Sequence, residues 1–127
     1  MTLMTLKIVT NNPYLIQDEE MPLEVHYTEG TPLDVLDEIE MLLQQGFRLL
    51  SAPLPPNVPL MRAPYRSLIL AVSDLRYDID GIEAIRKAKA RLDIERTVRV
   101  APKASDFAEL DRIMLLQELS YMAAFNT

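Results

Sequence analysis

The sequence predicts an α/β protein: a single domain with a mostly parallel sheet of four to five strands and helices on both faces. Short apolar, β-branched runs alternate along the chain with longer segments in which apolar residues recur every three to four positions. The chain has 127 residues, of which 49% are hydrophobic, and this is the size of one domain with its own core. No internal repeat or linker divides residues 1–127.

Four segments have the composition of strands, and a fifth is a further candidate. Ser67–Val72 is almost continuously apolar, which is typical of a strand buried on both faces. The first strand ends in the turn signal Asn11-Asn12-Pro13. The predicted strands are Leu6–Thr10, Leu23–Tyr27, Phe47–Ser51 and Ser67–Val72, with Thr97–Ala101 as the possible fifth.

Three segments are predicted to be helices. The clearest begins with Thr31 as cap, Pro32 at the first helical position and Asp34 three residues after the cap, and Gly46 is its expected left-handed stop. A second runs from a capping box at Asp80 and Glu83 to about Asp93, and a third runs from Ser105 or Asp106 towards Met122.

The composition excludes several kinds of chemistry. The chain has no Cys and one His, which rules out thiol catalysis, disulfides, Fe–S clusters and thiolate zinc sites. With three Gly, it shows no phosphate-binding glycine loop, no dinucleotide fingerprint and no nucleophile elbow. The sequence therefore predicts no catalytic set, no metal and no cofactor.

Charge is unevenly distributed in a chain of net charge −6. Ile8–Phe47 contains nine acids and no Lys or Arg, whereas basic residues cluster between Arg86 and Lys103. This basic stretch has two interpretations: a phosphate-tracking surface, or a solvated helix face opposite the acidic half, within the fold or across a dimer. Few aromatic residues lie among the basic ones, and the predicted helix has acidic residues in its first turn and basic residues in its last turns. Both observations favour the solvated helix face and predict no nucleic-acid partner.

The sequence predicts a cytoplasmic protein that does not contact a membrane. No uncharged apolar run approaches the roughly 18 residues of a transmembrane helix. No secretory leader precedes the first predicted strand.

A ligand site is predicted beyond the carboxyl ends of the strands, where loops converge in a parallel sheet. Asn11 and Asn12 follow the first strand, Ser51 follows the third and opens the proline-rich loop Pro53–Pro64, and Ser73 follows the fourth. Asparagine amides suit recognition of carboxylates, amides or phosphates. The alternative for the pair is an Asx-turn before Pro13.

A second group of polar residues precedes the fourth strand. Arg62 and Arg66 flank a rigid Pro-Tyr turn at Tyr65, and two guanidiniums can clamp a carboxylate or phosphate. In a parallel sheet this group shares a pocket with Asn11 only if the loop folds back; the alternative is pairing with the acidic helix. The candidate residues for a small anionic ligand are Asn11, Asn12, Ser51, Tyr65, Arg66 and Ser67.

Two further hypotheses concern His26 and the C-terminal helix. His26 is either a structural or surface histidine or, as an alternative to Arg66, the reactive centre of a small enzyme. Residues 114–125 are apolar around more of the helix than one sheet face can cover. This predicts a homodimer, unless the segment wraps the sheet edge of a monomer.

The order and spacing of several motifs resemble the GrdX family over roughly Lys7 to Leu70. The segments that carry the resemblance are Lys7–Pro13, Glu29-Gly30, Asp34–Leu36, Gly46, Leu49-Leu50, Pro53-Leu54 and Pro64–Ser67. The resemblance implies a small accessory protein encoded beside glycine, sarcosine and betaine reductase components. Gln45, Phe47 and Ala52 stand where the family pattern has histidines, so the resemblance implies binding or assembly rather than catalysis.

Overall fold

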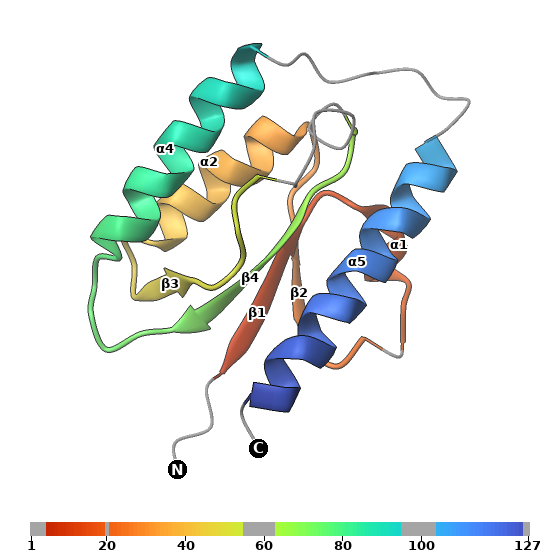
Figure 1. The fold of residues 1–127 in the computed structure, drawn as a ribbon, viewed down its shortest axis with the longest axis horizontal. Coiled ribbons are helices and arrows are strands. Elements are labelled where there is room, and N and C mark those ends of the chain that lie inside the picture. The colour runs from red at the N-terminus through yellow and green to blue at the C-terminus, as the bar shows by residue number, and fades with distance from the viewer. Residues whose placement is uncertain (1–4, 20, 55–62, 95–103, 126–127) are drawn as a thin grey trace.

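The described residues form one four-stranded sheet between two layers of helices (Figure 1). The structure, a computed structural model, describes residues 5–19, 21–54, 63–94 and 104–125. The predicted α/β class and the helices on both faces are confirmed. The elements are β1 (Leu6–Thr10), α1 (Pro13–Ile16), β2 (Glu24–Tyr27), α2 (Pro32–Leu42), β3 (Phe47–Leu49), β4 (Ser67–Val72), α4 (Ile79–Ile94) and α5 (Ala104–Phe125).

The sheet is mixed, so the prediction of a mostly parallel sheet is wrong. The strand order is β2-β1-β4-β3. β1 pairs with β2 in parallel, whereas β4 is antiparallel to both of its neighbours, β1 and β3. A parallel β3–β4 pair would need a crossover, usually a helix, and residues 52–66 contain five prolines that disfavour one. The possible fifth strand, Thr97–Ala101, lies outside the described residues.

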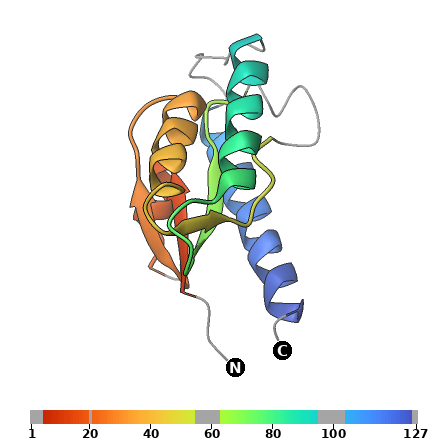
Figure 2. The same ribbon diagram turned by 90° about the vertical axis from the view of Figure 1, so that its left-hand side faces the viewer.

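Alternating strand residues build a core on each face of the sheet. Val9, Leu68 and Leu70 face α2 and α4, while Ile8 and Ile69 pack with residues of α1 and α5. Figure 2, turned by 90°, shows α2 and α4 side by side on their face of the sheet and α5 on the other. Because side chains alternate along a strand, Ser67 and Ile69 of β4 both face α5.

The local signals for α2 are confirmed. The main-chain N–H of Thr31 donates to Asp34 Oδ2 (2.7 Å), and the N–H of Asp34 donates to Thr31 Oγ1 (3.3 Å), which makes the predicted capping box. Gly46 has φ +96°, the left-handed conformation expected after the helix.

The start of α4 differs from the prediction. Asp78, not Asp80, precedes the helix, and its Oδ1 accepts a hydrogen bond from the N–H of Gly81 (3.1 Å). Asp78 Oδ2 also accepts from the N–H of Leu49 in β3 (2.9 Å), a contact that sequence spacing does not show. One side chain therefore caps α4 and ties it to the edge of the sheet.

The acidic and basic segments meet within the fold. Lys89 of α4 lies 2.7 Å from Asp37 and 3.5 Å from Glu40, both in α2, and Arg86 lies 3.5 Å from Glu40. For Arg86 and Lys89 these contacts agree with a helix face opposite the acidic half, while Arg96, Arg99 and Lys103 lie outside the described residues. None of the helices in the described ranges is long and apolar enough to cross a membrane.

Candidate functional site

The reversed direction of β4 brings the two predicted groups of site residues together. Ser67, the first residue of β4, pairs with Thr10, the last residue of β1. The Asn11-Asn12 turn and the segment ending in Arg66 therefore meet at one end of the sheet, because β4 runs antiparallel to β1. Ser73 follows β4 at the opposite end of the sheet, so its predicted convergence with Asn11 is wrong.

Asn11 holds the loop before β4 in place. Its Nδ2 donates to the carbonyl oxygens of Pro64 (2.8 Å) and Gly30 (2.9 Å), and its Oδ1 accepts from the N–H of Arg66 (2.8 Å). The residue is 2% exposed. Both amide hydrogens are in use, so Asn11 positions the backbone of Arg66 and has no donor left over.

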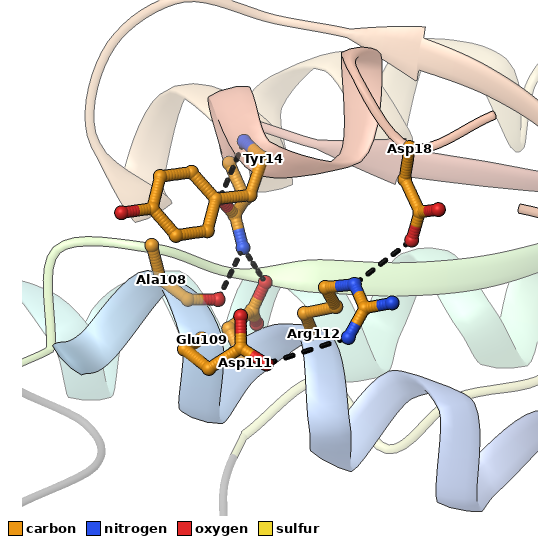
Figure 3. A network of polar contacts seen from close by, with 7 residues as sticks. Tyr14, Asp18, Ala108, Glu109, Asp111 and Arg112 are labelled. Atoms are coloured by element: carbon orange, nitrogen blue, oxygen red, sulfur yellow. Dashed lines mark hydrogen bonds and ion pairs between the residues drawn. The ribbon is translucent and has the colours of Figure 1, made fainter. Parts of the chain in front are cut away.

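Asn12 joins the start of α1 to α5. Its Oδ1 accepts from the N–H of Tyr14 (3.0 Å), which caps α1. Its Nδ2 donates to the carbonyl oxygen of Ala108 (2.8 Å) and to Asp111 Oδ2 (2.9 Å), both in α5 (Figure 3). Next to this contact Arg112 pairs with Asp18, at 2.8 Å. These contacts fix α5 against the end of β1.

A directed chain of hydrogen bonds ends on Asp111. The N–H of Asn12 donates to Thr10 Oγ1 (2.9 Å), the hydroxyls of Thr10 and Ser67 lie 2.7 Å apart, and Ser67 donates to Asp111 Oδ2 (2.6 Å). A serine hydroxyl has one hydrogen, so Thr10 must donate to Ser67. Each step in the chain therefore points towards the carboxylate of Asp111.

Burial raises the pKa of Asp111 because a low-dielectric environment disfavours the charged form. The hydrogen bonds from Ser67 and Asn12 and the charge of Arg66 act in the opposite direction.

Ser51 connects the sheet to a second acid of α5. Its Oγ accepts from the N–H of Ile69 (2.8 Å) and donates to Glu118 Oε1 (2.7 Å). Glu118 is seven residues after Asp111, which places both carboxylates on one side of the helix, two turns apart. Ser51 is thus a positioning residue for Glu118.

Arg66 faces these two acids from the sheet side. Its Nη2 donates to the carbonyl oxygen of Ala52 (3.0 Å), and its Nε is buried with no acceptor among the described residues. Burial lowers the pKa of Arg66, and the charges of Asp111 and Glu118 oppose that effect. No direct ion pair joins Arg66 to either of these two described carboxylates.

A cavity of about 80 Å³ separates the start of β4 from α5. Its polar wall consists of Tyr65, Arg66, Ser67, Asp111 and Glu118. Its apolar wall consists of Ala63, Phe107, Leu110, Met114 and Leu115. The lining, an apolar side with a few converging polar groups, resembles that of small-molecule sites, and the volume suits only a small ligand.

The six predicted residues occupy two layers around this cavity. Tyr65, Arg66 and Ser67 line it, while Asn11 and Asn12 lie behind and hold Arg66 and Asp111. Ser51 likewise lies behind Glu118. Arg62 lies outside the described residues.

Sequence reasoning missed Asp111 and Glu118. Their spacing of seven within the final helix is the signal that indicates one shared face.

His26 is not part of this site. Its Nε2 lies 3.1 Å from Glu38 Oε1 of α2, so it belongs to the face of the sheet opposite α5. Across the described part of the chain, no three metal-ligating acids or histidines gather into one cluster. Of the two candidate reactive centres, His26 lies away from the cavity, whereas Arg66 lines it.

Comparison with protein families identifies one match that covers most of the chain. The family model described as GrdX-like protein matches residues 7–120, a range that contains every residue lining the cavity. Neither the curated proteins nor the solved structures contain a match to the chain. Because the family match spans most of the sequence, the chain belongs to the GrdX-like protein family.

Proposed function

We propose that this protein is a non-catalytic accessory protein that binds a small carboxylate in the cavity between β4 and α5. A guanidinium has five N–H donors, and among the described residues Arg66 uses one of them, towards Ala52. Unused donors beside a cavity suit the two oxygens of a carboxylate, which arginine binds in a bidentate manner. This donor capacity of Arg66 is the observation that carries the proposal.

Two features favour a carboxylate over a phosphate and binding over catalysis. Asp111 and Glu118 line the same cavity, and they repel a dianion more strongly than a monoanion. The hydroxyl of Ser67 is held between Thr10 and Asp111, and the residue is 6% exposed, which suits a framework role. A cytoplasmic location and an association with amino-acid reductase components stay predictions.

Propionate is a suitable first probe, because it is small and carries one carboxylate. A ligand that binds only the folded state raises the unfolding midpoint in a concentration-dependent way. We expect propionate to stabilise the wild-type protein and Arg76→Gln, a matched charge removal outside the cavity, but not Arg66→Gln. Circular dichroism checks that Arg66→Gln folds; if it does not, Arg66→Lys replaces it and should bind more weakly. An unshifted wild-type midpoint, or equal shifts in both Gln variants, would contradict the proposal.

We also propose, as a second function, that α5 joins two copies of this chain into a homodimer. Leu110 and Ile113 lie one turn apart on α5 and are 40% and 42% exposed, and Tyr121 continues the same side of the helix. An exposed apolar stripe along a helix is typical of a surface that packs on another helix. The stripe differs from the cavity wall, although Leu110 borders both.

A further inference from the structure

The cavity is lined by more acidic than basic side chains. Arg66 is its one cation among the described lining residues, whereas Asp111 and Glu118 are both carboxylates. A ligand that carried only a carboxylate would add a third negative charge to a partly enclosed space. Such a ligand would be attracted by Arg66 and repelled by both acids of α5.

The three charged groups face one space without neutralising each other directly. Arg66 interacts electrostatically with both acids, yet no direct ion pair joins it to either of these described residues. The side-chain hydrogen bonds of the acids within the described ranges engage Asp111 Oδ2 and Glu118 Oε1, and the main chain of Ser67 also interacts with Asp111. Asp111 Oδ1 and Glu118 Oε2 therefore keep acceptor capacity on the α5 side of the cavity.

We propose that the ligand is a small zwitterion whose carboxylate binds Arg66 and whose ammonium group binds Asp111 and Glu118. This inference rests on the proposed function and names its ligand class. Phe107, Met114 and Leu115 line the same cavity and supply contacts for a short aliphatic segment. The chemistry of the three walls together is that of a site for a small aliphatic amino acid.

The framework behind the cavity fits this arrangement. Ser51 fixes Glu118, and Ser67 and Asn12 fix Asp111, so both carboxylates are oriented before a ligand arrives. Preorganised acceptors reduce the entropy lost on binding an ammonium group.

Matched probes separate the two ends of the ligand. Propionate carries the carboxylate alone, propylamine carries the amine alone, and alanine and β-alanine carry both at different spacings. Leucine and 4-methylpentanoate repeat the comparison with a longer aliphatic chain. Isothermal titration of the full chain gives a dissociation constant for each probe.

We expect at least one zwitterion to bind wild-type protein about tenfold or more tightly than its matched carboxylate, the factor that one charge-assisted hydrogen bond supplies. In Glu118→Gln, whose amide oxygen can still accept from Ser51, that advantage should fall and propionate should bind at least as tightly as before. Glu109→Gln, an exposed acid of α5 outside the cavity lining, should keep the wild-type ratio.

The outcomes distinguish this inference from the proposed function. Equal binding of carboxylates and zwitterions, or an advantage that persists in both Glu118→Gln and Asp111→Asn, would overturn the zwitterion assignment and leave carboxylate binding intact. Tight binding of propylamine that survives Arg66→Gln would also overturn it, because the carboxylate end would then contribute nothing. Absence of binding by every probe would overturn the carboxylate site and the zwitterion assignment together.

Discussion

Asn12 makes three hydrogen bonds through one fully buried side chain, to Tyr14, Ala108 and Asp111. Asn12→Ala removes the cap of α1 and leaves the carbonyl of Ala108 without this donor. We expect a loss of about 2–4 kcal/mol in the free energy of unfolding, the sum of a cap and an unsatisfied buried group. Urea denaturation measures it. Gln117→Ala, at an exposed position of α5, should stay within about 0.5 kcal/mol of wild type; an equally small effect of Asn12→Ala would contradict the framework role.

Asp111 makes a contribution to stability that depends on pH. Burial raises its pKa in the folded state, so above about pH 4, the ordinary pKa of an aspartate, the unfolded chain loses this proton first. Its contribution to stability is therefore greatest at low pH and decreases as pH rises through the folded pKa. Asp111→Asn does not titrate, so the stability of wild type minus that of the variant should fall between pH 4 and 7 in urea denaturation series. A difference that rises with pH would show that the hydrogen bonds from Ser67 and Asn12 outweigh burial.

For single residues, the sequence identifies the important residue types but not their hydrogen-bond partners. Asn11, Asn12 and Arg66 stand out as polar residues at strand ends. The acceptors that use up the asparagine hydrogens include Pro64 and Asp111, which are 53 and 99 residues away in the chain. Whether an amide binds a ligand or positions its neighbour depends on such distant contacts, so local patterns cannot separate the two roles.

The ion pairs between α2 and α4 are partly exposed to solvent, so their contribution to stability should depend on salt concentration. Lys89 is 30% exposed and contacts both Asp37 and Glu40, and the hydrogen bond to Asp37 raises its pKa. Lys89→Met should lower stability by about 0.5–1 kcal/mol at low salt and by less in 1 M NaCl, because salt screens exposed pairs. Lys87→Met, whose side chain is 77% exposed and pairs within its own helix, serves as the control with a smaller effect. An effect of Lys89→Met that salt does not change would contradict an electrostatic origin.

Elements with local signals can be predicted closely, whereas their directions in the sheet cannot. The bounds of β1 and β4 and the capping box of α2 follow from residues within a few positions of each other. The antiparallel insertion of β4 depends on pairing between Thr10 and Ser67, 57 residues apart. The proline-rich segment before β4 is the one sequence feature that argues against a parallel crossover there.

For the whole molecule, the exposed stripe on α5 predicts a homodimer. Size-exclusion chromatography with light scattering should give twice the chain mass of 14.5 kDa for wild type. Ile113→Glu should give a monomer, because a buried unpaired charge is unfavourable at an apolar interface. Ile79→Glu, at an exposed position of α4, should leave the protein dimeric. A monomeric wild type at about 100 μM, a concentration at which interfaces of micromolar affinity are mostly formed, would contradict the dimer.

The fold as a whole explains why the candidate site forms where it does. β1 and β3 both run antiparallel to β4, so their carboxyl ends and the amino end of β4 lie at the same end of the sheet. α5 packs against this end of the sheet and places Asp111 and Glu118 opposite Arg66. The site thus depends on residues from three distant parts of the chain, which a single motif cannot reveal.

The most direct test of the carboxylate site is an amide-resolved NMR titration of the full chain with propionate and alanine. Binding in the cavity predicts saturable shifts of the Arg66, Ser67 and Glu118 amides and of the Arg66 Nε–H, with resonances of α2 and α4 unchanged. The absence of saturable shifts at these positions, or shifts confined to the α2 and α4 face, would contradict the account.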